Sequence, residues 1–107
     1  MAVAETLREK QSRFALMVSH LILWAYANDY ELTFGDAYRA KTCSHGHHKS
    51  LHRQRLAIDL NLFRDGKWLT NTEDHQPLGE FWESIGGTWG GRFGDGNHYS
   101  LEHEGIK

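Results

Sequence analysis

The chain has 107 residues, a length that suits one compact domain. Its formal net charge is −2, so the chain as a whole has no electrostatic attraction for nucleic acid or for anionic membranes. Hydrophobic residues make up 39% of the chain, which allows a modest core. Cys43 is the single cysteine, which excludes an intramolecular disulfide and any dependence on an oxidising compartment.

The N-terminus carries neither the basic start nor the apolar run of a signal peptide. The apolar stretch 14–27 is interrupted by Ser19 and His20 and is too short to span a bilayer. We therefore expect synthesis in the cytoplasm and no membrane insertion. One domain is expected over residues 1–107, and we expect it to be a monomer.

The first expected element is a long amphipathic helix over residues 4–29. Its apolar residues recur at spacings of three, four and seven, beginning with Leu7 and Phe14. From Phe14 onward the segment is almost wholly apolar, which predicts that the second half of the helix is deeply buried. His20 lies in that half, so we expect a buried, hydrogen-bonded histidine.

Alternation of polar and apolar residues predicts a strand over 31–38, followed by a long loop over 40–50. Residues 56–63 are a stronger strand prediction because they are rich in Leu and Ile. The dipeptide Asp65-Gly66 then favours a hairpin turn, with residues 68–70 returning as a short partner strand.

A second helix is expected over 78–85, with Thr72 as a candidate N-cap ahead of it and Gly86-Gly87 ending it. The alternation over 98–102 predicts a last strand. This order of elements predicts an α+β domain in which a small antiparallel sheet packs on the long N-terminal helix.

Two short motifs carry most of the chemical information. One contains His52 and Asp59, and the other contains Asp95 and His98. Two histidines and one carboxylate make the N,N,O ligand set of many catalytic zinc sites, in which three protein ligands leave the fourth tetrahedral position open for water. Asp95, three residues before the last histidine, is placed to take that water's proton.

The spacing of the first motif suits a loop histidine followed by a strand aspartate. His52 and Asp59 lie seven positions apart, too far for one helical face. An aspartate in so apolar a strand is costly to bury unless it is paired or bound to metal. The alternatives are a polar cluster without metal, and an Asp95 that merely caps the turn at Gly96-Asn97.

Taken together, the motifs SxHxxxxAxD and DxxH, joined by Trp-Gly-Gly-x-Phe, resemble the zinc peptidases that cleave bacterial wall peptides. This family has the hedgehog/D-Ala-D-Ala peptidase fold. It includes D-Ala-D-Ala carboxypeptidases and dipeptidases, and the small L-alanyl-D-glutamate endopeptidases that phages use as endolysins. The resemblance covers roughly residues 30 to 103.

The resemblance implies a zinc peptidase acting on peptidoglycan stem peptides. Because only six residues follow Leu101, we expect no separate cell-wall-binding domain, unlike in larger relatives. The endolysin-type endopeptidase is the first expectation. A D-Ala-D-Ala carboxypeptidase or dipeptidase is the alternative, as is a non-catalytic zinc-containing binding protein of the same fold. The protein would reach the cell wall after release from the cytoplasm, which is the host cytoplasm for a phage protein.

Carried over residue by residue, the resemblance implies that His52, Asp59 and His98 bind Zn²⁺. It implies that Asp95 is the general base, which deprotonates water and later protonates the leaving amine. Many relatives have Glu at that position, and Asp is usual in the phage endopeptidase branch.

Two more positions match the family. Arg39 corresponds to an arginine that meets the substrate and stabilises the oxyanion, and Ser50 corresponds to a serine that contacts substrate or orients the site. Arg55 is a departure, because the family pattern has glycine there. A cation at this position would either alter substrate preference or point to solvent.

The loop before the first motif holds a second group of potential ligands, namely Cys43, His45, His47 and His48. The group lacks the further spaced ligands of a structural zinc site, so we expect it at most to line the substrate cleft. A histidine-rich loop is also found in some metal-dependent nucleases, but this chain lacks a basic stripe, and no nucleic-acid partner is expected. Trp89 is either a core residue or a wall of the cleft.

Overall fold

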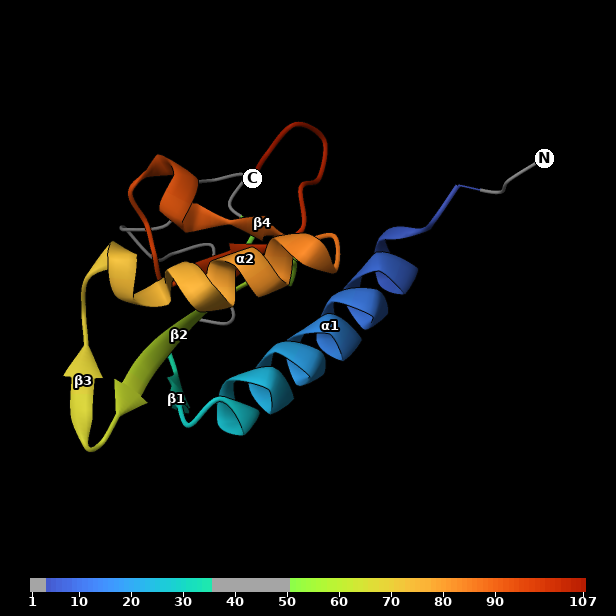
Figure 1. Ribbon diagram of the computed structural model, residues 1–107. Coiled ribbons are helices and arrows are strands. Elements are labelled where there is room, and N and C mark those ends of the chain that lie inside the picture. The colour runs from blue at the N-terminus through green and yellow to red at the C-terminus, as the bar shows by residue number, and fades with distance from the viewer. Residues whose placement is uncertain (1–3, 36–50) are drawn as a thin grey trace.

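The structure is a computed structural model, and it describes residues 4–35 and 51–107 (Figure 1). Its helices and strands, in chain order, are α1 (Leu7–Ala27), β1 (Glu31–Phe34), β2 (Ala57–Arg64), β3 (Lys67–Leu69), the 3₁₀ helix η1 (Thr72–His75), α2 (Gln76–Ser84), β4 (Thr88–Trp89), the 3₁₀ helix η2 (Gly90–Phe93) and β5 (His98–Ser100). The strands form antiparallel pairs beside the long N-terminal helix, which confirms the predicted α+β class.

Strand β2 is the centre of the sheet. β1 pairs with one of its edges, and the other edge is shared by two strands. β5 lies opposite residues 57–59 of β2, whereas β3 lies opposite residues 62–64. β4 then adds to the outer edge of β5. The register places Asp59 directly opposite His98, so the two predicted motifs meet across one strand pair.

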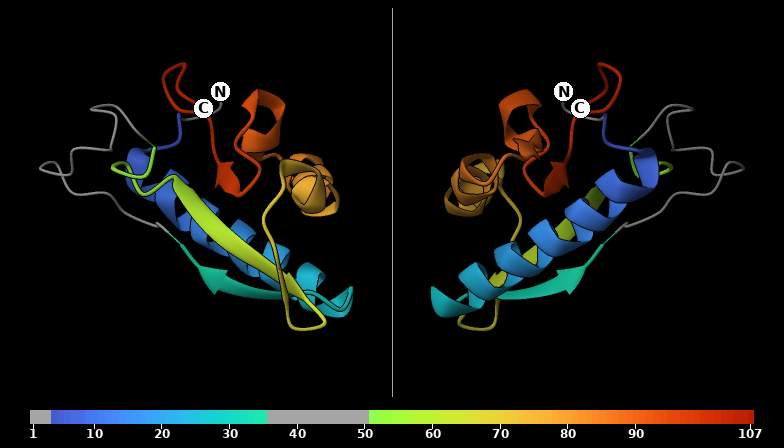
Figure 2. Two further views of the ribbon diagram at one scale, coloured as in Figure 1. Left: turned by 90° about the vertical axis from the view of Figure 1, so that its left-hand side faces the viewer. Right: turned by 90° about the vertical axis from the view of Figure 1, so that its right-hand side faces the viewer.

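Helix α1 begins with a capping box, in which Thr6 and Glu9 each accept a hydrogen bond from the other's backbone N–H, at 3.0 and 3.1 Å. The helix runs along β2 in both views of Figure 2. Its buried residues share one face, which packs on the core formed by the sheet and α2: Phe14, Met17, Val18, Leu21 and Ala25. No helix in residues 4–35 and 51–107 has the length and apolar character of a membrane span.

The expectation that the second half of α1 is deeply buried is wrong. Leu16, Leu23 and Tyr26 are 60%, 68% and 50% exposed, and His20 is exposed as well. The sheet and α2 cover only one side of α1, so apolar residues on the other side keep their contact with solvent. An apolar composition predicts helix formation here, but it does not reveal which sides of the helix are covered.

The strand predicted over 31–38 is seen as β1, which ends at Phe34, so Gly35 lies outside it, and residues 36–38 fall outside the described residues. The hairpin between β2 and β3 is confirmed. Asp65 and Gly66 have φ values of 52° and 76°, so both adopt the left-handed conformation that a tight two-residue hairpin requires.

Helix α2 begins at Gln76, two residues earlier than predicted, and Thr72 is not its cap. Thr72 is instead the first residue of η1, which Asn71 precedes. The backbone N–H of Asn71 donates to the carboxylate of Asp74 at 3.1 Å, so that carboxylate stabilises the start of η1. The short strand β4 was not predicted from the sequence.

A buried histidine ties η1 to the sheet. His75 is 3% exposed, and its Nδ1 lies 2.8 Å from the hydroxyl of Tyr99 in β5. Burial lowers the pKa of His75 to about 4, although the charge of Asp74 acts in the opposite direction. Between about pH 4 and pH 6.5, His75 is therefore a neutral imidazole in the folded protein, whereas the same histidine binds a proton in the unfolded chain.

We expect this difference to make the protein less stable in mild acid. Stability from neutral His75 is complete above about pH 6.5 and is lost as pH falls towards 4, so moving from pH 7 to pH 5 costs about 2 kcal/mol. Urea midpoints at the two pH values test this. His75→Gln is expected to flatten the dependence, and His20→Gln, at an exposed position, to leave it unchanged. Equal pH dependence in all three proteins would contradict the assignment.

Candidate metal centre

Three separate segments bring the predicted ligands together. His52 lies in the turn that precedes β2, Asp59 lies within β2, and His98 is the first residue of β5. The turn is anchored by Leu51, which is 2% exposed and whose carbonyl accepts a hydrogen bond from the backbone N–H of Leu56 at 2.8 Å. This closed turn carries His52 back over β2 despite the seven-residue spacing from Asp59.

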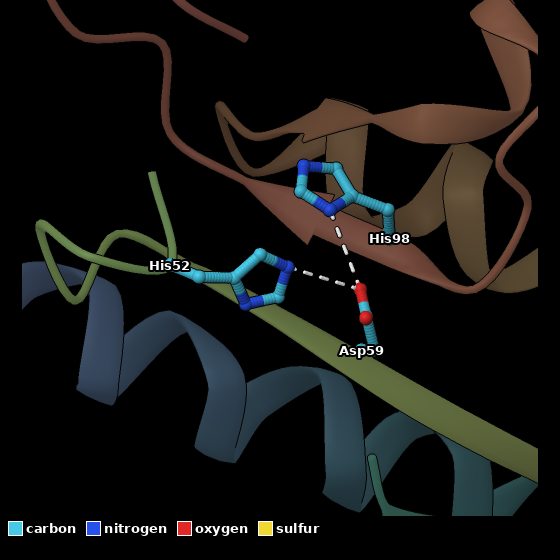
Figure 3. Close-up of side chains that lie close together, drawn as sticks. All are labelled: His52, Asp59 and His98. Carbon is cyan, nitrogen blue, oxygen red and sulfur yellow. Dashed lines mark hydrogen bonds and ion pairs between the residues drawn. The ribbon is translucent and has the colours of Figure 1, made fainter. Parts of the chain in front are cut away.

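Both histidine rings point at the same carboxylate oxygen (Figure 3). The distance from His52 Nε2 to Asp59 Oδ1 is 3.3 Å, and that from His98 Nδ1 to Asp59 Oδ1 is also 3.3 Å. One ligand atom from each of the three residues lies within 4.8 Å of the others. Helix α1 lies beneath β2, on the side away from these side chains (Figure 3).

These distances are also those expected between ligands that share one metal ion. Ligands about 2.0–2.1 Å from a tetrahedral zinc ion stand about 3.3–3.4 Å from one another. The donor set of two imidazoles and one carboxylate, at this spacing, therefore suits Zn²⁺.

The cluster is buried, and its carboxylate is ionised. The side chains of His52, His98 and Asp59 are 4%, 10% and 18% exposed. Burial raises the pKa of the Asp59 carboxyl, but the hydrogen bonds and charges of His52 and His98 together outweigh burial and hold that pKa at about 2. Asp59 is thus a carboxylate at neutral pH, the form in which it binds a metal.

Asp95 lies beside the cluster. Its Oδ2 is 3.9 Å from His98 Nδ1, the nitrogen that also faces Asp59, and its side chain is 54% exposed. A turn holds it there, because the backbone N–H of His98 donates to the Asp95 carbonyl at 3.2 Å. This placement leaves the Asp95 carboxylate open to solvent and close to the cluster, as a proton acceptor needs.

The Trp-Gly-Gly-x-Phe stretch supports this turn. The indole N–H of Trp89 donates to the carbonyl of Gly96 at 2.7 Å, and Trp89 is only 3% exposed, so it is a core residue beneath the loop. A Cβ atom on Gly90 would lie 2.2 Å from the carbonyl oxygen of Asp95 and 2.7 Å from the Cβ of His98. Only glycine fits at position 90 without displacing the second motif.

We therefore expect Gly90→Ala to weaken metal binding. The added methyl group would push Asp95 and His98 away from Asp59, and disturbance of the supporting residues of a metal site typically costs about 10- to 100-fold in metal affinity. Competition with a chromophoric chelator measures this. Gly86→Ala is the control for a general loss of stability: it strains a backbone position with a φ of 104°, but nothing lies within 4 Å of the added Cβ, so metal affinity should not change. Unchanged affinity in Gly90→Ala would contradict the packing argument.

An open cleft of about 470 Å³ adjoins the cluster, lined by Leu51, Phe93, Asp95, His98 and residues 105–107. The ring of Phe93 lies 6.1 Å from that of His98 and is 51% exposed, so it forms an apolar side of the cleft. The sequence analysis predicted no role for Phe93. Its place in the Trp-Gly-Gly-x-Phe motif, between Trp89 and Asp95, could have indicated one.

Several predicted residues cannot be placed relative to this cleft. Arg39 and Ser50 fall in residues 36–50, outside the described residues, as do Cys43, His45, His47 and His48. Arg55 is described and exposed, and it lines a groove beside α1 together with Gln11 and Ala15. Its φ of 55° explains why a glycine suits this position, because glycine adopts that conformation without steric cost.

Two imidazoles converging on one carboxylate, with a further carboxylate beside them, define a candidate metal-dependent hydrolase centre. The model of the D-alanyl-D-alanine carboxypeptidase family matches residues 44–101, more than half of the chain. The chain belongs to this family of peptidases. The matched region contains His52, Asp59, Asp95 and His98. Among curated proteins, no sequence matches this chain.

Proposed function

We propose that this protein is a zinc-dependent peptidase that hydrolyses peptidoglycan stem peptides, as an L-alanyl-D-glutamate endopeptidase of the phage endolysin type. One observation carries the proposal. His52 and His98 converge on a single oxygen of Asp59 at 3.3 Å, and Asp95 lies 3.9 Å from the same nitrogen of His98. Membership of a peptidase family supports the reaction class.

In this proposal His52 Nε2, Asp59 Oδ1 and His98 Nδ1 hold the metal, since these are the atoms that face one another. When bound, Zn²⁺ supplies the Lewis acidity that brings the pKa of a water molecule down towards about 7. Asp59 binds as the carboxylate and so adds a negative charge to the site. His52 and His98 bind as neutral imidazoles.

Asp95 moves the proton. Its exposed carboxylate accepts a proton from the attacking water and returns it to the amine that leaves when the peptide bond breaks. Phe93 offers the substrate an apolar surface beside His98. On the strength of the resemblance, we assign oxyanion stabilisation and substrate contact to Arg39, and substrate contact or orientation of the site to Ser50.

The choice of the L-alanyl-D-glutamate bond is supported by the DxxH form of the second motif, which is usual in the phage branch of the family. In that setting the enzyme is made in the host cytoplasm and reaches the wall after release. The second candidate is a D-Ala-D-Ala carboxypeptidase. The family's description names that activity, and Lys107 lines the cleft, where its ammonium group could bind a terminal carboxylate.

Mass spectrometry of muropeptides after digestion of purified sacculi separates the two candidates. The proposal predicts stem peptides that begin at D-glutamate, together with glycan that retains L-alanine. Loss of the terminal D-alanine alone would contradict the endopeptidase assignment and favour the carboxypeptidase. If a protein with one zinc bound per chain forms neither product, a binding role is favoured instead. The presence of Asp95 argues against that outcome.

A further inference from the structure

A second pocket shares Asp95 with the cleft at the metal cluster. Its volume is about 220 Å³, and it lies where the partner of β2 changes from β5 to β3. The polar and aromatic residues that line it come from β2, from β3 and the segment after it, from η1 and from the loop before β5: Asn61, Trp68, Thr70, Thr72, His75, Asp95 and Asn97.

The lining suits an uncharged ligand rich in hydroxyl and amide groups. Asn97 supplies an amide, and Asn61 supplies an amide oxygen, since its Nδ2 donates to Thr33 Oγ1 at 3.2 Å. Thr70 and Thr72 supply hydroxyls, which act as both donors and acceptors. Of the residues that line this pocket, none is Lys or Arg, and Asp95 carries a negative charge. A carboxylate ligand would therefore meet no cation here and would be repelled by Asp95.

Trp68 adds an aromatic surface to these polar groups. It is 63% exposed, although indole is among the side chains that gain most from burial. The ring stacks on that of its cross-strand partner Phe63, with centroids 6.5 Å apart and planes inclined by 23°. This contact holds the indole in place at the pocket, where its exposed face is available to a ligand.

The pocket lies on the same face of the sheet as the metal cluster. Asp59, Asn61 and Phe63 alternate along β2 and therefore share one face, and Trp68 stands opposite Phe63 on that face. Each two-residue step along a strand is about 6.8 Å, so Asn61 is one step from Asp59 and Trp68 is about two steps away. One extended residue spans about 3.5 Å, which is less than the roughly 14 Å between Asp59 and Trp68. The near edge of the pocket is Asp95, which also lines the cleft at the cluster, so a bulky group one amino acid from a bond held there would enter the pocket and extend towards Trp68.

We propose that this pocket binds the N-acetylated sugar of the glycan strand to which the stem peptide is joined. The apolar face of the sugar ring would lie on Trp68, and its acetamido and hydroxyl groups would bond to Asn61, Asn97 and the threonines. The proposal rests on the proposed function. In an L-alanyl-D-glutamate endopeptidase the sugar is one residue from the bond that is cut, whereas the D-Ala-D-Ala bond is several residues further away.

A pair of substrates tests this directly. One is a stem peptide carrying N-acetylmuramic acid, and the other is the same peptide with an acetyl group in place of the sugar. Trp68→Ala is expected to lower kcat/KM for the sugar-bearing substrate about tenfold and to leave the sugar-free substrate within about twofold. Phe34→Ala is the matched control, because Phe34 is 66% exposed and lies opposite Leu60, on the other face of the sheet.

Equal losses on both substrates, or no loss on either, would overturn the sugar assignment. So would a loss confined to peptides with a free side-chain amine, which would indicate that Trp68 and Asp95 bind a cation. A titration with the disaccharide of N-acetylglucosamine and N-acetylmuramic acid, followed through the indole N–H resonance of Trp68, does not depend on catalysis. A shift at Trp68 in a protein that cuts neither substrate would retain the sugar site and refute the proposed function. Cleavage of both substrates without any shift at Trp68 would refute the sugar site and retain the proposed function.

Discussion

Replacing His52 with alanine is expected to abolish zinc binding and peptidase activity together. His52 Nε2 is one of the three proposed ligand atoms, and its side chain is 4% exposed, so water cannot easily take its place without rearrangement. The two remaining ligands, Asp59 and His98, would hold the ion far less tightly. Zinc per chain after dialysis, together with hydrolysis of sacculi, measures both effects in one preparation.

His20→Ala is the matched control for this experiment. It also removes one histidine, but from an exposed position on α1, and it should retain full zinc content and activity. His98→Ala is expected to behave like His52→Ala. One zinc per chain in a folded His52→Ala protein would refute the ligand assignment, and circular dichroism establishes whether the variant is folded.

Replacing Asp95 with asparagine is expected to separate chemistry from metal binding. The Asp95 side chain is 54% exposed and its carboxylate lies beside the three ligands, so zinc should remain bound. Asparagine cannot accept the proton of the attacking water, and loss of a general base typically lowers turnover by about 10²- to 10⁴-fold. We therefore expect kcat to fall by that amount while KM changes little.

Asp65→Asn, in the exposed turn between β2 and β3, makes the same chemical change away from the site and should have no effect on kcat. Two results would contradict the role of Asp95. Full turnover in Asp95→Asn would exclude it as the base, and loss of zinc from that variant would make it a ligand.

The main elements of the fold could be predicted because each has a local signal. Helix α1 has an apolar period, β2 is a run of Leu and Ile, and the Asp65-Gly66 turn fixes the hairpin. Strand β4 could not be predicted, because two residues are too few to show a period and its pairing with β5 depends on tertiary contacts. The exposed side of α1 was missed for a related reason, since burial depends on which elements cover a helix.

The candidate site, too, could be predicted from the sequence only in part. Its four polar residues were predicted because two motifs matched jointly, and the structure brings His52, Asp59 and His98 together. The supporting contacts were not predicted. The close approach of Gly90 to Asp95 joins backbone atoms, and the hydrogen bond between His75 and Tyr99 links residues far apart in the chain. Neither contact has a signature in the spacing of residues.

The central claim, a zinc-dependent hydrolase of the bacterial wall, is tested most directly by the turbidity of permeabilised bacterial cells. Four preparations are compared: wild type, Asp95→Ala, wild type stripped of metal by a chelator, and the stripped protein restored with zinc. We expect clearing by the wild type, no clearing by Asp95→Ala or by the stripped protein, and recovery when zinc is returned. No clearing by any form, with one zinc still bound to each wild-type chain, would contradict the claim.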